Sequence, residues 1–407
     1  MIFDSDRHEA LVKADWSESL ALAQIQHIVR DTQDRFDSLQ FWPVHPHDTS
    51  ASDLADTGKT ALYHGACGVI WAMHYLQGCG AVSLDKDYLP HLEGIRARNQ
   101  EWLGTVYDEA APSYLMGDTP FRLLELGRSA DHAAPARTLH GLLASNLDHP
   151  HRDLMWGSPG TMLGAWFLHT HTGDAQWADV FRQTAAKLWS QLLWSDEFQC
   201  HYWTQDMYGR QSSYLDGVHG FVATASVLIK GRDLLEPQAW RGWEDCIVNT
   251  MEKTASVENG LTNWRAHLLT PSDEVPRLLM QICHGAPGFV VCLSALPSKS
   301  LDSLLLGAGE AIWQAGPLVK GANLCHGTAG NGYAFLKLFE RTGDAIWLQR
   351  ARAFAMHAVA QSDADRAAYG QGNYALWTGD LGLAIFLWDC VSGKPQFPTL
   401  DVFFAPG

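Results

Sequence analysis

Residues 323–330 read Asn-Leu-Cys-His-Gly-Thr-Ala-Gly and lead into an apolar run at 333–338. Residues 281–288, Gln-Ile-Cys-His-Gly-Ala-Pro-Gly, repeat the order Cys-His-Gly-x-x-Gly ahead of the apolar run 289–293. Either copy alone would be explained by a buried structural cysteine. The duplication favours a metal site instead, because two thiolates and one imidazole form a standard three-ligand zinc set. A helix that begins after each turn would also lower the pKa of the thiol.

The same local pattern, a short glycine turn followed by an apolar run of helix length, occurs seven times. The first glycines of these turns are Gly65, Gly117, Gly157, Gly220, Gly285, Gly327 and Gly379. Such a period indicates stacked units, and each unit has room for a helical hairpin. Strand patterns are sparse, so we predict an all-α fold. Seven hairpins form an open solenoid or a closed ring, and we expect the ring because it brings the turns to one rim.

Two further segments match each other, Thr-Gly-Asp-Ala-Gln-Trp at 172–177 and Thr-Gly-Asp-Ala-Ile-Trp at 342–347. We interpret each as a glycine that ends an inner helix, followed by an aspartate that caps an outer helix. The apolar spacing predicts outer helices over Trp177–Trp189 and Trp347–Ala360. An amphipathic helix is also predicted over Ala10–Arg30.

The overall composition narrows the classes of partner. The 407 residues carry a net charge of −16, which argues against nucleic acid and anionic membranes as partners. No apolar run reaches the roughly 18 residues that a membrane span needs, and residues 1–7 contain no signal-peptide core. Eight dispersed cysteines do not resemble a disulfide framework. We therefore expect a cytoplasmic protein in a reducing environment.

With these motifs the chain resembles the lanthionine synthetase C-like family, and within it the stand-alone, glutathione-associated LanC-like proteins more than the lantibiotic cyclases. The resemblance is sharpest at 281–293 and at 320–338, which contains Lys-Gly-x-x-Leu-Cys-His-Gly-x-Ala-Gly-Asn-x-Tyr-Ala-Phe-Leu. It implies an α/α toroid of about seven helical hairpins as a single domain over 1–407, with residues 1–60 packing on the toroid. It further implies a zinc ion held by Cys283, Cys325 and His326.

The chemistry that the resemblance implies is the addition of a thiol to a dehydroalanine or dehydrobutyrine residue, which gives a thioether. The thiol partner is glutathione or a peptide cysteine, and the electrophile is a dehydrated peptide or protein. His219, in the turn before Gly220, matches the family's rim histidine and is the candidate acid that protonates the α-carbon. Asp153 matches an aspartate that would orient His219 or accept the thiol proton.

Three further positions match the family pattern more loosely. The cyclases carry an arginine four residues before the first zinc cysteine, where this chain has Leu279. Arg277 is the nearest arginine and is a candidate for contacting the enolate oxygen or a substrate carboxylate. Lys320 matches a glutathione-associated position, and His284 is expected to contact substrate or to support the metal ligands.

Other interpretations remain open for these residues. His219 and Asp153 are also common helix-cap residues, and Lys320 also suits a solvated helix end. A protein that binds zinc and glutathione as a scaffold or sensor, without turnover, would use the same residues. An α/α-toroid glycosidase, with Asp153 paired with Asp380 or Asp216 as acid and base, would leave both Cys-His pairs unexplained.

Overall fold

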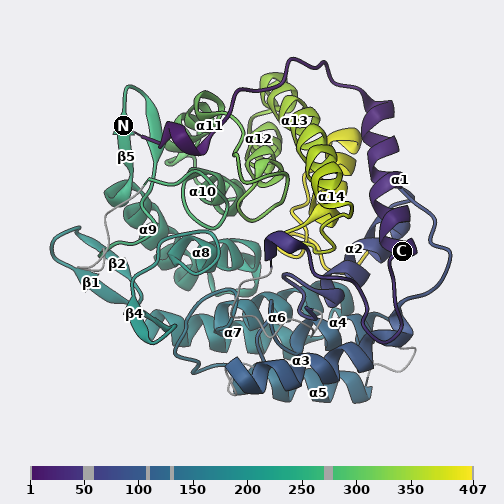
Figure 1. Ribbon diagram of the computed structural model, residues 1–407. Coiled ribbons are helices and arrows are strands. Elements are labelled where there is room, and N and C mark those ends of the chain that lie inside the picture. The colour runs from purple at the N-terminus through teal and green to yellow at the C-terminus, as the bar shows by residue number, and fades with distance from the viewer. Residues whose placement is uncertain (1, 49–58, 107–110, 129–132, 270–277, 406–407) are drawn as a thin grey trace.

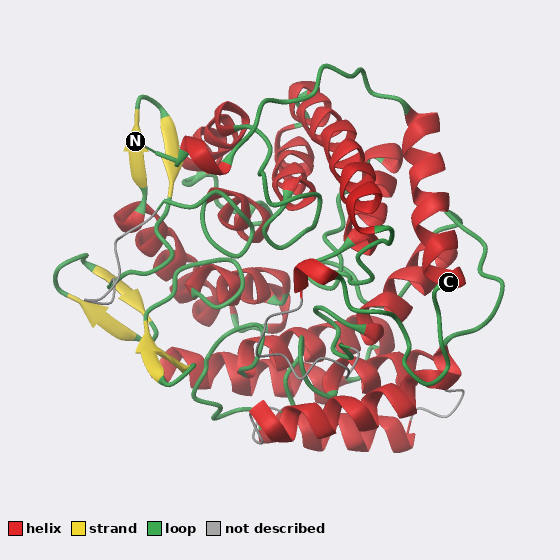
Figure 2. Cartoon of the chain, in the orientation of Figure 1, coloured by secondary structure: helices red, strands yellow, loops and turns green. Residues whose placement is uncertain are grey.

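The computed structural model describes residues 2–48, 59–106, 111–128, 133–269 and 278–405. Across these ranges it contains fourteen α-helices and three short antiparallel strand pairs (Figure 2). The strands are β1 (Leu193–Ser195), β2 (Cys200–Tyr202), β3 (Gln205–Met207), β4 (Arg210–Ser212), β5 (Ser256–Glu258) and β6 (Leu261–Asn263). The all-α prediction is therefore confirmed. No helix in these ranges is long and apolar enough to span a bilayer.

Seven inner helices begin at the predicted glycine turns. They are α2 (Ala66–Gly78), α4 (Thr119–Arg128), α6 (Ser158–Thr172), α8 (Phe221–Lys230), α10 (Ala286–Leu293), α12 (Thr328–Thr342) and α14 (Asp380–Ser392). Each contacts the next inner helix, and α14 contacts α2 (Figure 1). The hairpins thus close into an α/α toroid, which confirms the ring and excludes the open solenoid.

Seven outer helices surround this ring. They are α1 (Glu18–Asp34), α3 (Leu92–Val106), α5 (Ala133–Ser145), α7 (Ala175–Ser190), α9 (Pro237–Thr254), α11 (Asp302–Ala315) and α13 (Ala345–Tyr369). Most inner helices are largely apolar, although α4 keeps charged residues on one side, and every residue of α10 is buried. A helix of this composition must be covered on every face, whereas the outer helices bury one stripe only. Layering thus follows from the pattern of apolar residues.

The predicted junctions between inner and outer helices are confirmed. Gly173 and Gly343 end α6 and α12 in the left-handed conformation, with φ of 70° and 71°. The carboxylates of Asp174 and Asp344 then accept backbone N–H groups at the start of α7 and α13. Helix α13 continues to Tyr369, beyond the predicted end at Ala360.

The N-terminal segment closes the ring. Helix α1 packs against α14, so the last hairpin combines the two ends of the chain (Figure 1). At this seam the Arg366 guanidinium contacts the carboxylates of Asp31 in α1 and Asp380 in α14. Removing this shared cation would take from Asp380 its cationic partner and leave Asp31 with the more distant Arg35. That residues 1–407 form one domain stays a prediction.

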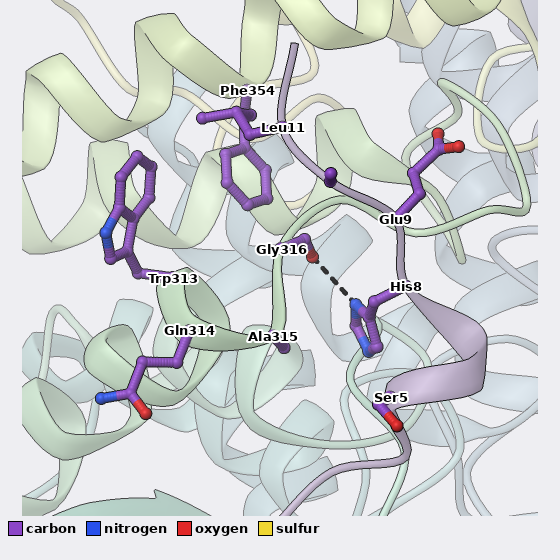
Figure 3. Close-up of a pocket in the computed structure, with 10 residues that line it drawn as sticks. Ser5, His8, Glu9, Leu11, Trp313, Gln314, Ala315, Gly316 and Phe354 are labelled. Atoms are coloured by element: carbon purple, nitrogen blue, oxygen red, sulfur yellow. Dashed lines mark hydrogen bonds between the residues drawn. The ribbon is translucent and has the colours of Figure 1, made fainter. Parts of the chain in front are cut away.

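The predicted helix over Ala10–Arg30 is wrong at its start. Helix α1 begins only at Glu18, where the Ser17 hydroxyl accepts the N–H of Leu20. The preceding chain is extended, because His8 forms an antiparallel bridge with Leu318 and its Nδ1 lies 2.9 Å from the Gly316 oxygen (Figure 3).

A cavity of about 440 Å³ lies between this N-terminal segment and α11, with Trp313 and Phe354 on its apolar side (Figure 3).

Candidate metal centre

The glycine turns are joined to one another by backbone hydrogen bonds around the ring. At six of the seven junctions between turns, the residue two places before the glycine, or its neighbour, bonds to the equivalent residue of the next turn. The bonds from N–H to oxygen are Tyr63 to Leu115, Leu115 to Met155, Leu154 to Val218, Cys283 to Cys325, Cys325 to Trp377 and Trp377 to Tyr63. This belt places the side chains that precede each glycine along one rim.

The glycines are required because the backbone of a turn folds back closely on itself and, at Gly217, approaches the next turn. A Cβ atom on Gly285 would lie 1.9 Å from the Leu279 oxygen, and the φ of Gly285 is 109°. At the seventh junction, between the turns of Val218 and Cys283, a Cβ on Gly217 would lie 2.6 Å from the Ile282 oxygen. The turns therefore pack backbone against backbone, which holds the rim side chains in register.

Three of the rim side chains form a compact donor set. The sulfur atoms of Cys283 and Cys325 and one ring nitrogen of His326 lie within 4.8 Å of one another. Cys325 is buried, and the other two are partly exposed, so the cluster is open on one side. The Tyr63 hydroxyl donates to the Cys325 sulfur at 2.8 Å, and Gln281 Nε2 donates to the Cys283 sulfur at 3.0 Å.

The Cys283 thiol is strongly affected by its neighbour Cys325. Contact with Cys325, followed by burial, raises the pKa of Cys283 well above its ordinary value. Burial, followed by the charge of Cys325, likewise raises the pKa of Tyr63. Tyr63 therefore stays a neutral phenol that can donate its proton to sulfur.

The donor set fits zinc. A tetrahedral zinc site with Zn–S of about 2.3 Å and Zn–N of about 2.0 Å places its ligand atoms roughly 3.5–3.8 Å apart. The three donors are already within 4.8 Å, so small side-chain shifts would complete such a site. Two sulfurs and one imidazole leave a fourth position for an outside ligand, as in catalytic rather than structural zinc sites.

An aspartate–histidine pair lies on the same rim. His219 Nδ1 is 2.6 Å from Oδ2 of Asp153, whose side chain is fully buried. The other carboxylate oxygen accepts the backbone N–H groups of Trp156 and Gly157, each at 2.9 Å. Because these bonds fix the carboxylate, the carboxylate in turn fixes the orientation of the imidazole.

A second pair has the same construction one repeat further on. His284 Nδ1 is 2.8 Å from Oδ2 of Asp216, and Oδ1 accepts the N–H groups of Val218 and His219. Burial alone would lower the pKa of His284, but the charge of Asp216 outweighs it and raises the pKa to about 9. The Tyr214 ring lies near both His219 and His284, with centroids 5.6 and 6.1 Å away.

Lys320 and Arg277 are the remaining predicted site residues. Lys320 is exposed. Its positive charge acts to lower the pKa of His284, against the effect of Asp216. It therefore lies near the rim, five residues before Cys325. Arg277 lies outside the described residues, which resume at Leu278.

Sequence reasoning missed three contributors to this rim, namely Asp216 as the partner of His284, Tyr63 and Gln281. A positional signal was present. The residue before the glycine is histidine in four turns, His64, His219, His284 and His326. The residue four places before the glycine has a carboxyl or amide side chain in four turns, where it is Asp153, Asp216, Gln281 or Asn323. Aligning the repeats on their glycines would have paired each aspartate with the next histidine.

The other six cysteines carry no such arrangement in the described chain. All are free thiols, and all but Cys79 are buried. Burial raises the pKa of Cys67, Cys292 and Cys390, which makes them poor thiolates. This agrees with their interpretation as core residues.

A closed ring of seven helical hairpins, with two cysteines and one histidine gathered on its rim, defines an α/α toroid that carries a candidate metal centre. The chain belongs to the lanthionine synthetase C-like family, whose model matches residues 53–402. The predicted family and fold are thereby confirmed.

Two relatives match shorter stretches. The zebrafish (Danio rerio) protein named glutathione S-transferase LANCL1 is 36% identical over 137 residues, which cover 31% of this chain and 32% of that protein. LanC-like protein GCL1 of Arabidopsis thaliana is 39% identical over 84 residues, 19% of either chain. The chain thus aligns with a third or less of the length of these relatives.

A solved structure shows the same fold over most of the chain. The structure of nisin cyclase superposes with a TM-score of 0.54, at 15% sequence identity, and covers 83% of this chain and 94% of that one. At this identity the similarity bears on the fold alone.

Proposed function

We propose that this protein forms carbon–sulfur bonds by adding a thiol to a dehydroalanine or dehydrobutyrine residue, with zinc as its cofactor. The observation that carries the proposal is the open Cys283–Cys325–His326 cluster on the rim that also bears the Asp153–His219 pair. A zinc ion in this cluster would act as a Lewis acid that lowers the pKa of an incoming thiol at neutral pH.

The reaction needs no further reactant. The thiol sulfur forms a bond to the β-carbon while the C=C π electrons move onto the carbonyl oxygen. The thiol releases its proton to water. With Nδ1 held by Asp153, His219 delivers one proton to the α-carbon through Nε2 and regains one from water, so that the reaction balances.

The thiol partner that the site favours is glutathione. Glutathione carries two carboxylates, and a chain of net charge −16 repels such an anion unless local cations meet it. Lys320 supplies a cation near the rim, and the name of the zebrafish relative refers to glutathione. A dehydrated peptide or protein is the proposed electrophile, and a reducing cytoplasm is the proposed location.

Incubation of the pure, zinc-loaded protein with glutathione and a dehydroalanine peptide tests the function. We expect a product heavier than the peptide by one glutathione, formed faster than in buffer with free zinc. The same peptide carrying an internal cysteine distinguishes cyclisation from glutathione addition. Zinc and glutathione binding without any thioether product would support the scaffold alternative and refute catalysis.

Lys320→Ala should weaken glutathione binding by about 1–3 kcal/mol, the range for a hydrogen bond to a charged group. Its zinc content should be unchanged, because Lys320 is no ligand. Calorimetric titration of both proteins at low and high salt measures this, and the difference should shrink as salt screens the charges. Lys299→Ala, which removes an exposed lysine elsewhere, is the control. Equal affinity in wild type and Lys320→Ala would remove Lys320 from the site and favour a peptide thiol.

The glycosidase alternative gains no support from the described residues. Asp153 and Asp216 each face a histidine, and Asp380 contacts Arg366 and Ser362 at the seam between α13 and α14. A glycosidase needs two carboxyl groups that flank one bond. Each of these aspartates is instead engaged by a histidine, or by an arginine and a serine, of the protein itself.

A further inference from the structure

The turn between β3 and β4 carries an aromatic residue in an unfavourable backbone conformation. Met207 pairs with Arg210, so Tyr208 and Gly209 form a two-residue turn with φ of 55° and 76°. Turns of this kind favour Asn-Gly or Asp-Gly, because both residues need positive φ. A bulky residue at the first position is strained. Tyr208 therefore occupies a place where local structure alone would select asparagine or aspartate.

The contacts of Tyr208 bring its phenol to the rim. Trp156 Nε1 donates a hydrogen bond to the Tyr208 oxygen at 3.2 Å, and the Tyr208 ring meets His219 edge to face, with centroids 6.2 Å apart. The backbone N–H of the same Trp156 donates to Asp153. One tryptophan thus holds both the aspartate of the Asp153–His219 pair and the phenol beside that pair.

The phenol also lies near Tyr63, which contacts the candidate metal centre. Tyr208 is close enough to Tyr63 to act on it electrostatically, and Tyr63 donates to the Cys325 sulfur. Tyr208 remains 52% exposed. Its half-exposed side chain therefore lies beside the Asp153–His219 pair, next to which an electrophile that His219 protonates must bind.

We propose that Tyr208 is a further catalytic residue, whose hydroxyl donates a hydrogen bond to the carbonyl oxygen of the dehydroamino acid. This inference rests on the proposed function. As the carbon–sulfur bond forms, the π electrons of the C=C bond move onto that oxygen, and a donor placed there stabilises the enolate. The bond from Trp156 strengthens the donor, because a hydroxyl that accepts one hydrogen bond becomes polarised. The oxygen returns to a carbonyl when the α-carbon is protonated.

Steady-state kinetics of Tyr208→Phe test this role, since the variant loses one oxygen and keeps the ring. We expect kcat with the dehydroalanine peptide to fall by about 10²-fold, as for the loss of one donor to a developing oxyanion. The KM for glutathione and the zinc content should stay unchanged. A tyrosine that only supported the turn would alter stability or both KM values without this selective loss of kcat.

The matched control is Tyr202→Phe, which removes the same hydroxyl from strand β2 at the edge of the molecule (Figure 1). It should retain wild-type kinetics. If wild type is active and Tyr208→Phe keeps its kcat, the inference is overturned while the proposed function stands. If Arg277→Ala alone loses kcat, the arginine is the oxyanion donor instead. If wild type forms no thioether, both the function and this inference fail.

Discussion

Cys325→Ala should lose most of the zinc that the wild-type chain binds, about one ion per chain, and with it all thioether formation. Even the loss of a residue that merely orients a ligand lowers metal affinity by about 10–100-fold, and the loss of a ligand should exceed that. The fold should survive, because the backbone N–H and oxygen of residue 325 carry the bonds to Trp377 and Cys283. Elemental analysis and circular dichroism of the purified variant measure both expectations.

Cys292→Ala is the control for this substitution. Cys292 lies in α10, nine residues after Cys283, and is buried away from the three donors. Its variant should bind zinc as the wild type does. Full zinc retention by Cys325→Ala would refute the assigned ligand set, and loss of zinc from Cys292→Ala would show that the assay reports general damage.

His219→Asn should abolish most turnover and leave zinc and glutathione binding intact. A positioned general acid contributes about 10²–10⁴-fold to a rate, and asparagine has no proton to transfer. The variant should remain folded, because Asp153 keeps its hydrogen bonds from Trp156 and Gly157 when the imidazole is removed. Product formation by mass spectrometry, with calorimetry for glutathione, separates the loss of chemistry from the loss of binding.

The control is a histidine paired with an aspartate elsewhere. His74 in α2 lies 3.4 Å from Asp87, and both lie outside the rim. His74→Asn removes a comparable pair and should leave turnover unchanged. If His219→Asn turns over at the wild-type rate, His219 has only a structural role, as in its interpretation as a helix-cap residue.

Repetition made much of this protein readable from its sequence. Seven glycine turns predicted seven hairpins, because each turn is a local sequence feature that is followed by its own helix. The three candidate ligands stood out for the same reason, since two copies of one motif placed two cysteines at equivalent positions. A single Cys-His pair would have carried no such information.

The start of α1 was misjudged because its apolar spacing runs on into a segment that tertiary contacts hold extended. His8 and Glu9 bond to residues 316 and 317, more than 300 positions away, and this pairing prevents the first turns of a helix. The local pattern of apolar residues contains no information about hydrogen-bond partners so distant in the chain.

The sequence by itself determined the hairpins, the glycine turns and the sulfur ligands, all of which depend on residues close together in the chain. Only the tertiary structure decided which aspartate faces which histidine, that α1 completes the last hairpin, and that Tyr208 reaches the rim. Asp153 and His219 belong to neighbouring repeats, and their contact depends on how two turns pack backbone against backbone. That register is set by the closed ring as a whole, because backbone hydrogen bonds join the turns at six junctions and close backbone packing joins them at the seventh.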